Sequence, residues 1–277
     1  MSESTFELTT IGKVAEIRLS RPDALNSFTP GFWREFREQV EALDDRGDVR
    51  ALVISSTGKH FTAGMDLGVF HAMPDLSAHE PGRARAAMMK TIDAFQETFN
   101  CLERARFPVL AAIQGGCIGG GVDLIAACDM RYCTANAFFV IQEINIGMMA
   151  DVGTFPRLQK VMHEGLVREL AFTGRRLSAE RALSAGLVNE TYKSQDEMLQ
   201  AVRATAQEIA EKSPLAVWGS KEALNYGRDH STRDTLKHIV TWQAGMWHMP
   251  DMQTAFKAQK AGEKPEFDDL LPNKPVI

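Results

Sequence analysis

The sequence feature that most constrains the fold is a cluster of five glycines within the seven residues Gly115 to Gly121. A strand-like apolar stretch, Pro108 to Ile113, precedes the cluster, and a helix-like stretch, Val122 to Cys128, follows it. Glycine loses more conformational freedom on folding than any other residue, so such a cluster is costly unless the backbone requires it. The position predicts either tight packing of a strand against a helix, or a site where free backbone N–H groups at a helix start hold an oxygen atom. Nucleotide phosphate is disfavoured as the ligand, because neither the G-x-G-x-x-G nor the P-loop pattern fits.

Strand-like and helix-like segments alternate along the first part of the chain. Two strands around a Gly-Lys turn predict a hairpin, and Thr29-Pro30 is typical of a helix start. Strands that alternate with helices predict an α/β fold with parallel strands. From about Glu164 onward the pattern becomes almost wholly helical, and residues 71 to 86 are polar enough to predict a surface excursion near a ligand mouth. The expected segments are strands 6–10, 14–19, 51–55, 108–113, 130–133 and 138–141, and helices 32–43, 91–102, 122–128, 179–185 and 196–212.

Composition excludes several classes of function. The 277 residues include 31 basic and 36 acidic side chains, a net charge of −5, which disfavours a nucleic-acid partner. No apolar run approaches the roughly 18 residues of a membrane span, so no membrane association is expected. The acidic, polar N-terminal stretch is unlike a targeting peptide and predicts a cytoplasmic protein. Four irregularly spaced cysteines predict buried thiols, and the scattered histidines predict no metal site.

Three acids are candidates for catalysis. Glu143 and Asp151 lie among apolar neighbours, where burial would raise the carboxyl pKa and suit it to proton transfer. Asp123 lies one residue beyond the glycine cluster, after Val122. Two of these acids also have a structural interpretation: Asp151 could cap a helix that starts near Val152, and Asp123 could be a first-turn acid that answers the helix dipole. A second glycine turn, Phe61 to Leu67, could supply another N–H group to one oxygen atom, as in an oxyanion hole.

These motifs together resemble the enoyl-CoA hydratase/isomerase (crotonase) superfamily. The resemblance rests on FTAGMD (Phe61 to Asp66), on IQGGCIGGGVD (Ile113 to Asp123) and on the acid twenty residues later, Glu143. The stretches Arg21 to Asn26 and Thr173 to Val188 also fit the family. The resemblance implies a crotonase-like spiral of strand–strand–helix units, with an acyl-CoA site in a core of residues 1–200. It also implies a helical region, residues 201–277, that forms a homotrimer or homohexamer.

The resemblance also implies the site residues. The N–H groups of Met65 and Gly120 would hold the thioester oxygen, and no cofactor is implied beyond the coenzyme A that carries the substrate. The acid set Asp123, Glu143 and Asp151 is similar to that of the dienoyl-CoA isomerases of the family, which convert 3,5-dienoyl-CoA to 2,4-dienoyl-CoA in unsaturated fatty acid degradation. The alternatives are 2-enoyl-CoA hydration by Asp123 and Glu143, and a non-catalytic binding protein. The residues that would line the path of the substrate are Ala24, Ala63, Gly64, Met65, Asp66, Leu67, Gly120 and Gly121.

Overall fold

The computed structural model describes residues 5–72 and 79–273 of the chain. A six-stranded sheet forms its centre, and every neighbouring pair in it is parallel except the first. The first pair is the predicted hairpin, in which Phe6 lies opposite Leu19. This arrangement confirms the predicted α/β fold with parallel strands. In spatial order the strands are β1 (Phe6–Ile11), β2 (Val14–Leu19), β3 (Ala51–Ser56), β4 (Val109–Ile113), β6 (Met130–Thr134) and β9 (Glu190–Tyr192).

A second, smaller sheet lies beside the first and carries the glycine cluster. Its strands are β5 (Gly116–Ile118), β7 (Phe138–Val140) and β8 (Leu177–Ser178). Strand β5 was not predicted, because its glycine-rich sequence has no strand-like pattern. Two isolated parallel bridges extend this layer, from Cys117 to Thr62 and from Met65 to Phe28. The chain therefore alternates between the two sheets, which gives the predicted spiral of strand–strand–helix units.

Helices cover both faces of the large sheet. The helices that follow the early strands are α1 (Pro30–Arg46), α2 (Leu67–Ala72), α3 (Pro81–Arg104), α4 (Gly120–Ala126), α5 (Thr154–Leu158), α6 (Glu164–Thr173), α7 (Ala179–Ser184) and α8 (Gln195–Ala210), with 3-10 turns η1 (Pro22–Ala24) and η2 (Glu143–Ile146). The start of α1 is as predicted, since the Thr29 side chain accepts a hydrogen bond from the Phe32 N–H and Pro30 is the first helical residue.

The two faces of the sheet are apolar because β3 and β4 are buried on both sides. Leu52 and Ile54 of β3 belong to the main core, together with Phe32 and Phe36 of α1. Ala51 and Val53 point the other way, into a cluster with α8. Helix α8 packs on the sheet, so the boundary predicted at residue 200 falls inside an element of the core.

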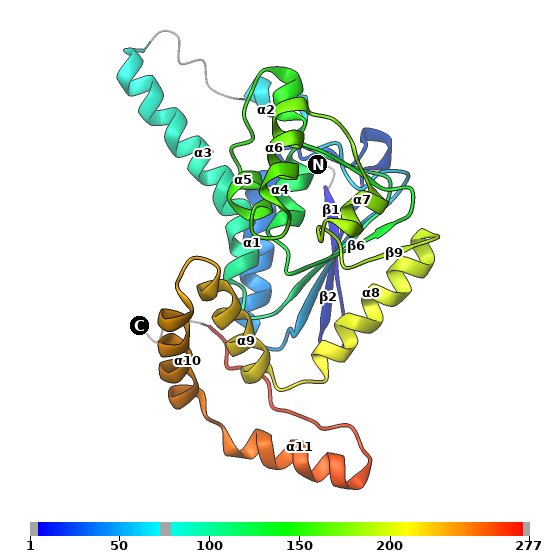
Figure 1. The fold of residues 1–277 in the computed structure, drawn as a ribbon, viewed down its shortest axis with the longest axis vertical. Helices are drawn as coiled ribbons and strands as arrows, with labels where there is room; N and C mark the ends of the chain where they lie inside the picture. The colour runs from blue at the N-terminus through cyan, green and yellow to red at the C-terminus, as the bar shows by residue number, and fades with distance from the viewer. Residues whose placement is uncertain (1–4, 73–78, 274–277) are drawn as a thin grey trace.

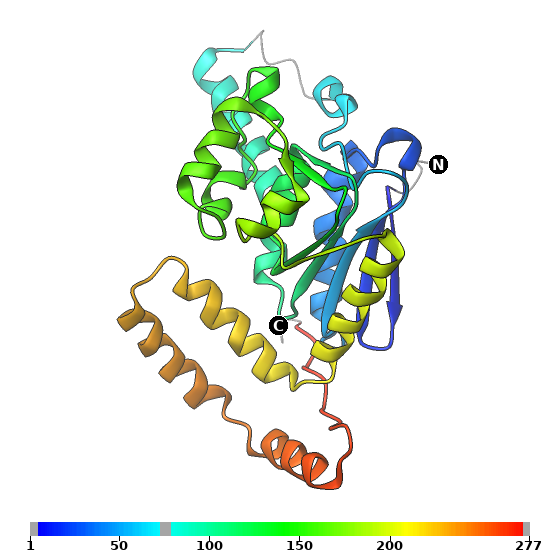
Figure 2. The same cartoon turned by 45° about the vertical axis from the view of Figure 1, so that its right-hand side comes forward.

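The last three helices form a separate layer beyond one end of the sheet (Figures 1 and 2). They are α9 (Pro214–Gly227), α10 (Thr232–Met246) and α11 (Met249–Ala261). Trp218 of α9 packs edge-on against Trp242 of α10, with ring centroids 5.0 Å apart. Buried Lys221 joins α9 to the core, because its Nζ donates to the Leu102 carbonyl at 2.7 Å and to the Asp129 carboxylate at 2.9 Å.

Several sequence expectations differ from the structure only in extent. Helix α3 begins at Pro81, ten residues before the predicted start, and takes up part of the predicted surface excursion. The rest of that excursion includes residues 73–78, which lie outside the described residues. All four cysteines are buried and free, as predicted. None of the helices in the described parts of the chain is long and apolar enough to cross a membrane.

Close packing excludes a side chain at Gly121, the last residue of the glycine cluster. Gly121, in the first turn of α4, faces the side chain of Thr62, and a Cβ added to Gly121 would lie 2.4 Å from Thr62 Cγ2. Thr62 cannot move freely, because its buried Oγ1 donates to the Asn26 carbonyl at 2.7 Å and accepts from the Gly64 N–H at 3.0 Å. The packing interpretation is therefore correct for Gly121.

This contact predicts a specific non-additive pair of substitutions. Gly121→Ala should lower the free energy of unfolding by about 1–3 kcal/mol, the usual cost of overpacking a core. Thr62→Ser removes the opposing methyl group and keeps the hydroxyl, so the double variant should recover most of that loss. A double-mutant cycle by denaturant unfolding at one protein concentration measures the coupling. Additive effects of the two substitutions would contradict the contact.

Candidate active site

The predicted site segments lie side by side in the structure. The Phe28 N–H donates to the Gly64 carbonyl at 2.8 Å, and the Ala63 N–H donates to the Leu25 carbonyl at 2.9 Å. These bonds join the loop after β2 to the turn after β3. The Ile118 N–H in turn donates to the Thr62 carbonyl at 3.1 Å, which joins that turn to the glycine cluster. Residues from three separate parts of the chain therefore meet at one place.

The backbone nitrogens of Met65 and Gly120 lie near each other at this meeting point. Gly64 has a φ of +84°, and a Cβ there would lie 3.0 Å from the Gly120 nitrogen and 2.6 Å from the Ile118 carbonyl oxygen. A Cβ on Gly120 would lie 3.9 Å from the Met65 nitrogen. No hydrogen bond from the Met65 or Gly120 N–H is found within the described residues. The nitrogen atoms of the two predicted donors are thus close together, and neither N–H group is engaged within the described residues.

Glu143 lies next to this pair. It opens the 3-10 turn η2, and its Oε1 would lie 3.2 Å from a Cβ on Gly119, the residue before Gly120. Its Oε2 is buried and has no hydrogen-bond partner among the described residues. Burial, reinforced by the negative charge of Asp123, raises the pKa of Glu143 to about 7. A carboxyl group with that pKa can accept or donate a proton near neutral pH.

Asp123 is buried in α4 and is tied to the start of α5. Its Oδ1 accepts hydrogen bonds from the Thr154 N–H and from Thr154 Oγ1, both at 2.7 Å. Burial raises the pKa of Asp123 to about 6, and the two Thr154 hydrogen bonds oppose that rise. Asp123 is in the first turn of α4, as its structural interpretation predicts. Its side chain also accepts a hydrogen bond from the first backbone N–H group of a second helix, α5.

Asp151 lies on the short loop that precedes α5. The prediction that it could cap a helix at Val152 is wrong, because α5 begins at Thr154 and its N-cap residue is Gly153. Burial raises the pKa of the Asp151 carboxyl, and the charge of Asp151 in turn contributes to the raised pKa values of Asp123 and Glu143. The three predicted acids therefore form one electrostatic group.

The remaining predicted residues have different surroundings. Ala24 ends the turn η1, and Leu67 is highly exposed at the start of α2. The Asp66 carboxylate is already used within the fold: it accepts from Ser27 Oγ at 2.7 Å and from the Gly68 N–H at 2.8 Å. These bonds, rather than contact with a ligand, account for the position of that side chain.

Sequence reasoning missed two residues that shape the site. Asn26 is buried with a φ of +53°, and its side-chain amide donates to the Thr57 and His60 carbonyls, which fixes the loop after β2. Thr154 holds Asp123. An asparagine in a Pro-containing loop is a signal for the first, whereas nothing in the sequence brings residues 123 and 154 together.

In the described parts of the chain, no three His, Cys, Asp or Glu side chains are grouped as metal ligands would be.

The raised pKa of Glu143 predicts a stability effect with a definite sign. Below its ordinary value of 4.5 the carboxyl group is protonated whether the chain is folded or not. Between pH 4.5 and about 7 the unfolded chain releases this proton while the folded protein keeps it, so stability falls over that range, and above about 7 the folded protein must bury the charge. Glu143→Gln should therefore raise the thermal midpoint more at pH 8 than at pH 5. The exposed substitution Glu38→Gln is the control, and an equal or smaller gain at pH 8 would argue against the raised pKa of Glu143.

Comparison with known proteins agrees with this geometry. A family model described as enoyl-CoA hydratase/isomerase matches residues 9–269. The mitochondrial Delta(3,5)-Delta(2,4)-dienoyl-CoA isomerase of Mus musculus is 42% identical, over 88% of this chain and 76% of its own length. The peroxisomal enzyme of the same name from Arabidopsis thaliana is 38% identical, over 94% of this chain and 95% of its own. A crystal structure of an enoyl-CoA hydratase from Bacillus anthracis has a TM-score of 0.84 at 26% identity, covering 95% of this chain and 99% of that one.

One sequence expectation is overturned by these relatives. The prediction of a cytoplasmic location is wrong, because the names of the two isomerases place them in mitochondria and peroxisomes. The predicted superfamily and its fold are confirmed, by a family match over nearly the whole chain and by the structural similarity. The chain belongs to the enoyl-CoA hydratase/isomerase family.

Proposed function

We propose that this chain is an isomerase that converts 3,5-dienoyl-CoA to 2,4-dienoyl-CoA in the degradation of unsaturated fatty acids. The observation that carries the proposal is the group of three partly or fully buried acids with raised pKa values beside two free N–H groups. Relatives named as this isomerase, at 42% and 38% identity, support it. The substrate enters as a coenzyme A thioester, and the mechanism requires no other cofactor.

The reaction needs two proton-transfer groups because its two carbon atoms are far apart. A proton leaves carbon 2 and another arrives at carbon 6, while the extended dienolate places its negative charge on the thioester oxygen. The N–H groups of Met65 and Gly120 stabilise that charge. Glu143, the acid beside the N–H pair, takes the proton from carbon 2, and Asp151 delivers the proton to carbon 6.

Asp123 adjusts the acids rather than contacting the substrate. Its charge contributes to the raised pKa of Glu143, and its hydrogen bonds to Thr154 hold the loop that carries Asp151. Interacting carboxyl groups push their pKa values apart, which lets one serve as base while another keeps its proton. The substrate path runs along Ala24, Ala63 to Leu67 and Gly121, mainly through backbone and small side chains.

Two alternatives make different use of the same residues. Hydration of a 2-enoyl-CoA, supported by the likeness to the Bacillus anthracis hydratase, would use Asp123 and Glu143 to hold a water molecule and would leave Asp151 without a function. A non-catalytic binding protein would need none of the three raised pKa values. The complete acid group favours the isomerase.

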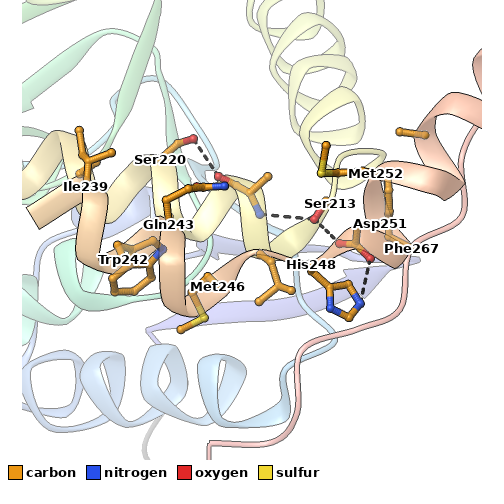
Figure 3. A pocket seen from close by; sticks show the side chains of 15 residues that line it. Ser213, Ser220, Ile239, Trp242, Gln243, Met246, His248, Asp251, Met252 and Phe267 are labelled. Atoms are coloured by element: carbon orange, nitrogen blue, oxygen red, sulfur yellow. Dashed lines mark hydrogen bonds and ion pairs between the residues drawn. The ribbon is translucent and has the colours of Figure 1, made fainter. Parts of the chain in front are cut away.

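We also propose that the chain assembles as a homotrimer or homohexamer through α9 to α11. Several large apolar side chains of these helices are exposed, among them Leu224 at 72%, Val240 at 69% and Phe256 at 62%. A cavity of about 530 Å³ lies between the same helices (Figure 3). Trp242 and Met246 line it, and Asp251 links Ser213 to His248 at its edge. Large exposed apolar side chains that gather in one region of a protein are typical of a protein interface.

The acids provide the direct test of the proposed function. Glu143→Gln and Asp151→Asn should each lower isomerase turnover about 100-fold or more, the scale of general acid–base catalysis. Formation of the thioester-conjugated diene is followed by absorbance, and affinity for octanoyl-CoA by calorimetry should remain nearly unchanged. The unmodified protein is also given a 2-enoyl-CoA, and mass spectrometry identifies the product, since hydration adds a water molecule. Mainly hydrated product together with no reaction of the diene would refute the isomerase proposal.

Assembly is tested by analytical ultracentrifugation. The protein should sediment at three or six times the 30.7 kDa chain mass, since closed symmetric oligomers are the usual form. Val240→Glu, which places a charge on the exposed face of α10, should lower that mass. Ile11→Glu, at an exposed apolar position on β1, is the control. If the unmodified protein stays monomeric at micromolar concentration, the proposed assembly is ruled out.

A further inference from the structure

One polar face of α3 is directed at the loop that carries Asp151. Gln96, Asn100 and Glu103 are spaced at i, i+4 and i+7, which places them on one side of a helix. Gln96 Nε2 donates to the Asp151 backbone carbonyl at 2.6 Å. Asn100 Oδ1 and the Glu103 carboxylate both accept from Arg157 of α5. This row of side chains therefore holds both ends of the segment from residue 151 to residue 157.

Arg157 is the centre of these contacts. Its side chain is only 8% exposed, and its Nε and Nη2 lie 3.0 and 2.6 Å from Glu103 Oε2. Its Nη1 donates to the Val152 carbonyl at 3.4 Å. The Gly153 backbone, with a φ of +130°, lies in close contact with the guanidinium, and a Cβ there would lie 1.8 Å from Nη1. The backbone of the loop is thus shaped against a fixed, buried cation.

The loop that Arg157 shapes carries Asp151 itself and also Thr154, the residue that holds Asp123. Asp151 directly precedes Val152, and Thr154, which directly follows Gly153, donates two hydrogen bonds to Asp123. A shift of Val152 and Gly153 would therefore move the Asp151 carboxyl group and loosen Asp123 at the same time. In the described parts of the chain neither acid is hydrogen-bonded to Arg157. The positive charge of Arg157 lowers the pKa of Asp123, whereas its link to Asp151 runs through the backbone of the loop.

The same network reaches the helical C-terminal region. Glu103 Oε1 accepts from Arg228, the residue after α9, at 2.7 Å, while Oε2 of the same carboxylate holds Arg157. Asn225 of α9 donates to the Glu103 backbone carbonyl at 3.1 Å. Arg157 is buried whereas Glu103 is 26% exposed. Removal of Glu103 would leave the buried Arg157 charge without this partner, which is strongly destabilising.

We propose that Arg157, held by Glu103 and Asn100, is a positioning residue that sets the place of the Asp151 carboxyl group for proton delivery. The inference rests on the proposed function, in which Asp151 is the proton donor. It assigns to α3 and to the end of α9 the task of fixing the donor loop. Misplacement of a catalytic group by about 1 Å can cost about 100-fold in rate, so the effect falls on turnover rather than on binding.

Two variants and one control test this role. Arg157→Met removes the cation, and Gln96→Leu removes only the hydrogen bond to the Asp151 carbonyl, a milder change that leaves the ion pairs intact. Arg168→Met is the control, since it breaks an exposed ion pair with Glu164 on α6. Diene turnover, octanoyl-CoA affinity by calorimetry and deuterium uptake by peptides that cover residues 148–158 are measured for each variant and for the unmodified protein.

Arg157→Met should lower kcat about 10- to 100-fold and Gln96→Leu by a smaller factor, with octanoyl-CoA affinity within about threefold of the unmodified protein. Deuterium uptake should rise in residues 148–158 and stay unchanged in β3 and β4. If kcat and the number of octanoyl-CoA sites per chain fall by the same factor, Arg157 has a merely structural role and the proposal is wrong. Unchanged kcat in both variants would also overturn the proposal. If the unmodified protein does not isomerise the diene, the proposed function fails. Deuterium uptake then decides on its own whether Arg157 holds the loop.

Discussion

The close approach of two backbone turns, at Gly64 and at Gly120, is the constraint on which the rest of the site depends. A side chain on Gly64 would strike the Ile118 carbonyl oxygen, and one on Gly121 would strike Thr62. Because these glycines have no side chains, the two turns approach closely and the Met65 and Gly120 nitrogens lie near each other. Tight packing of the glycine cluster and the proposed oxygen-binding role of its backbone are therefore compatible in one structure. Packing at Gly121 positions the free N–H group of its neighbour.

Burial of the three acids costs the folded protein free energy. Burial raises the pKa of Glu143 to about 7, and its Oε2 has no hydrogen-bond partner within the described residues. Asp123 is treated differently, because Thr154 satisfies its Oδ1 twice. Unsatisfied buried groups of this kind are uncommon in folded proteins and concentrate where a protein handles protons. A stable framework of parallel strands and apolar clusters offsets the cost.

Much of the fold could be predicted from the sequence, because apolar runs such as β3 and β4 are buried on both faces and stand out. The early start of α3 could not, since residues 81–90 are mostly exposed and have no core-facing pattern. Glu143 and Asp151 were predicted from apolar neighbours and family motifs. Arg157 was not, because its partner Glu103 lies 54 residues away and only the fold brings them together.

The central claim is that two different carboxyl groups act on carbon 2 and carbon 6, each exchanging protons with solvent between turnovers. Conversion of an unlabelled 3,5-dienoyl-CoA in D2O, with the product analysed by NMR, tests it most directly. The account predicts that a single turnover places deuterium at carbon 6, because Asp151 delivers a solvent-derived proton, while carbon 2 loses one of its original hydrogens. A product that carries its original carbon 2 hydrogen at carbon 6 would contradict the account, since one group would then have moved the same proton between both atoms.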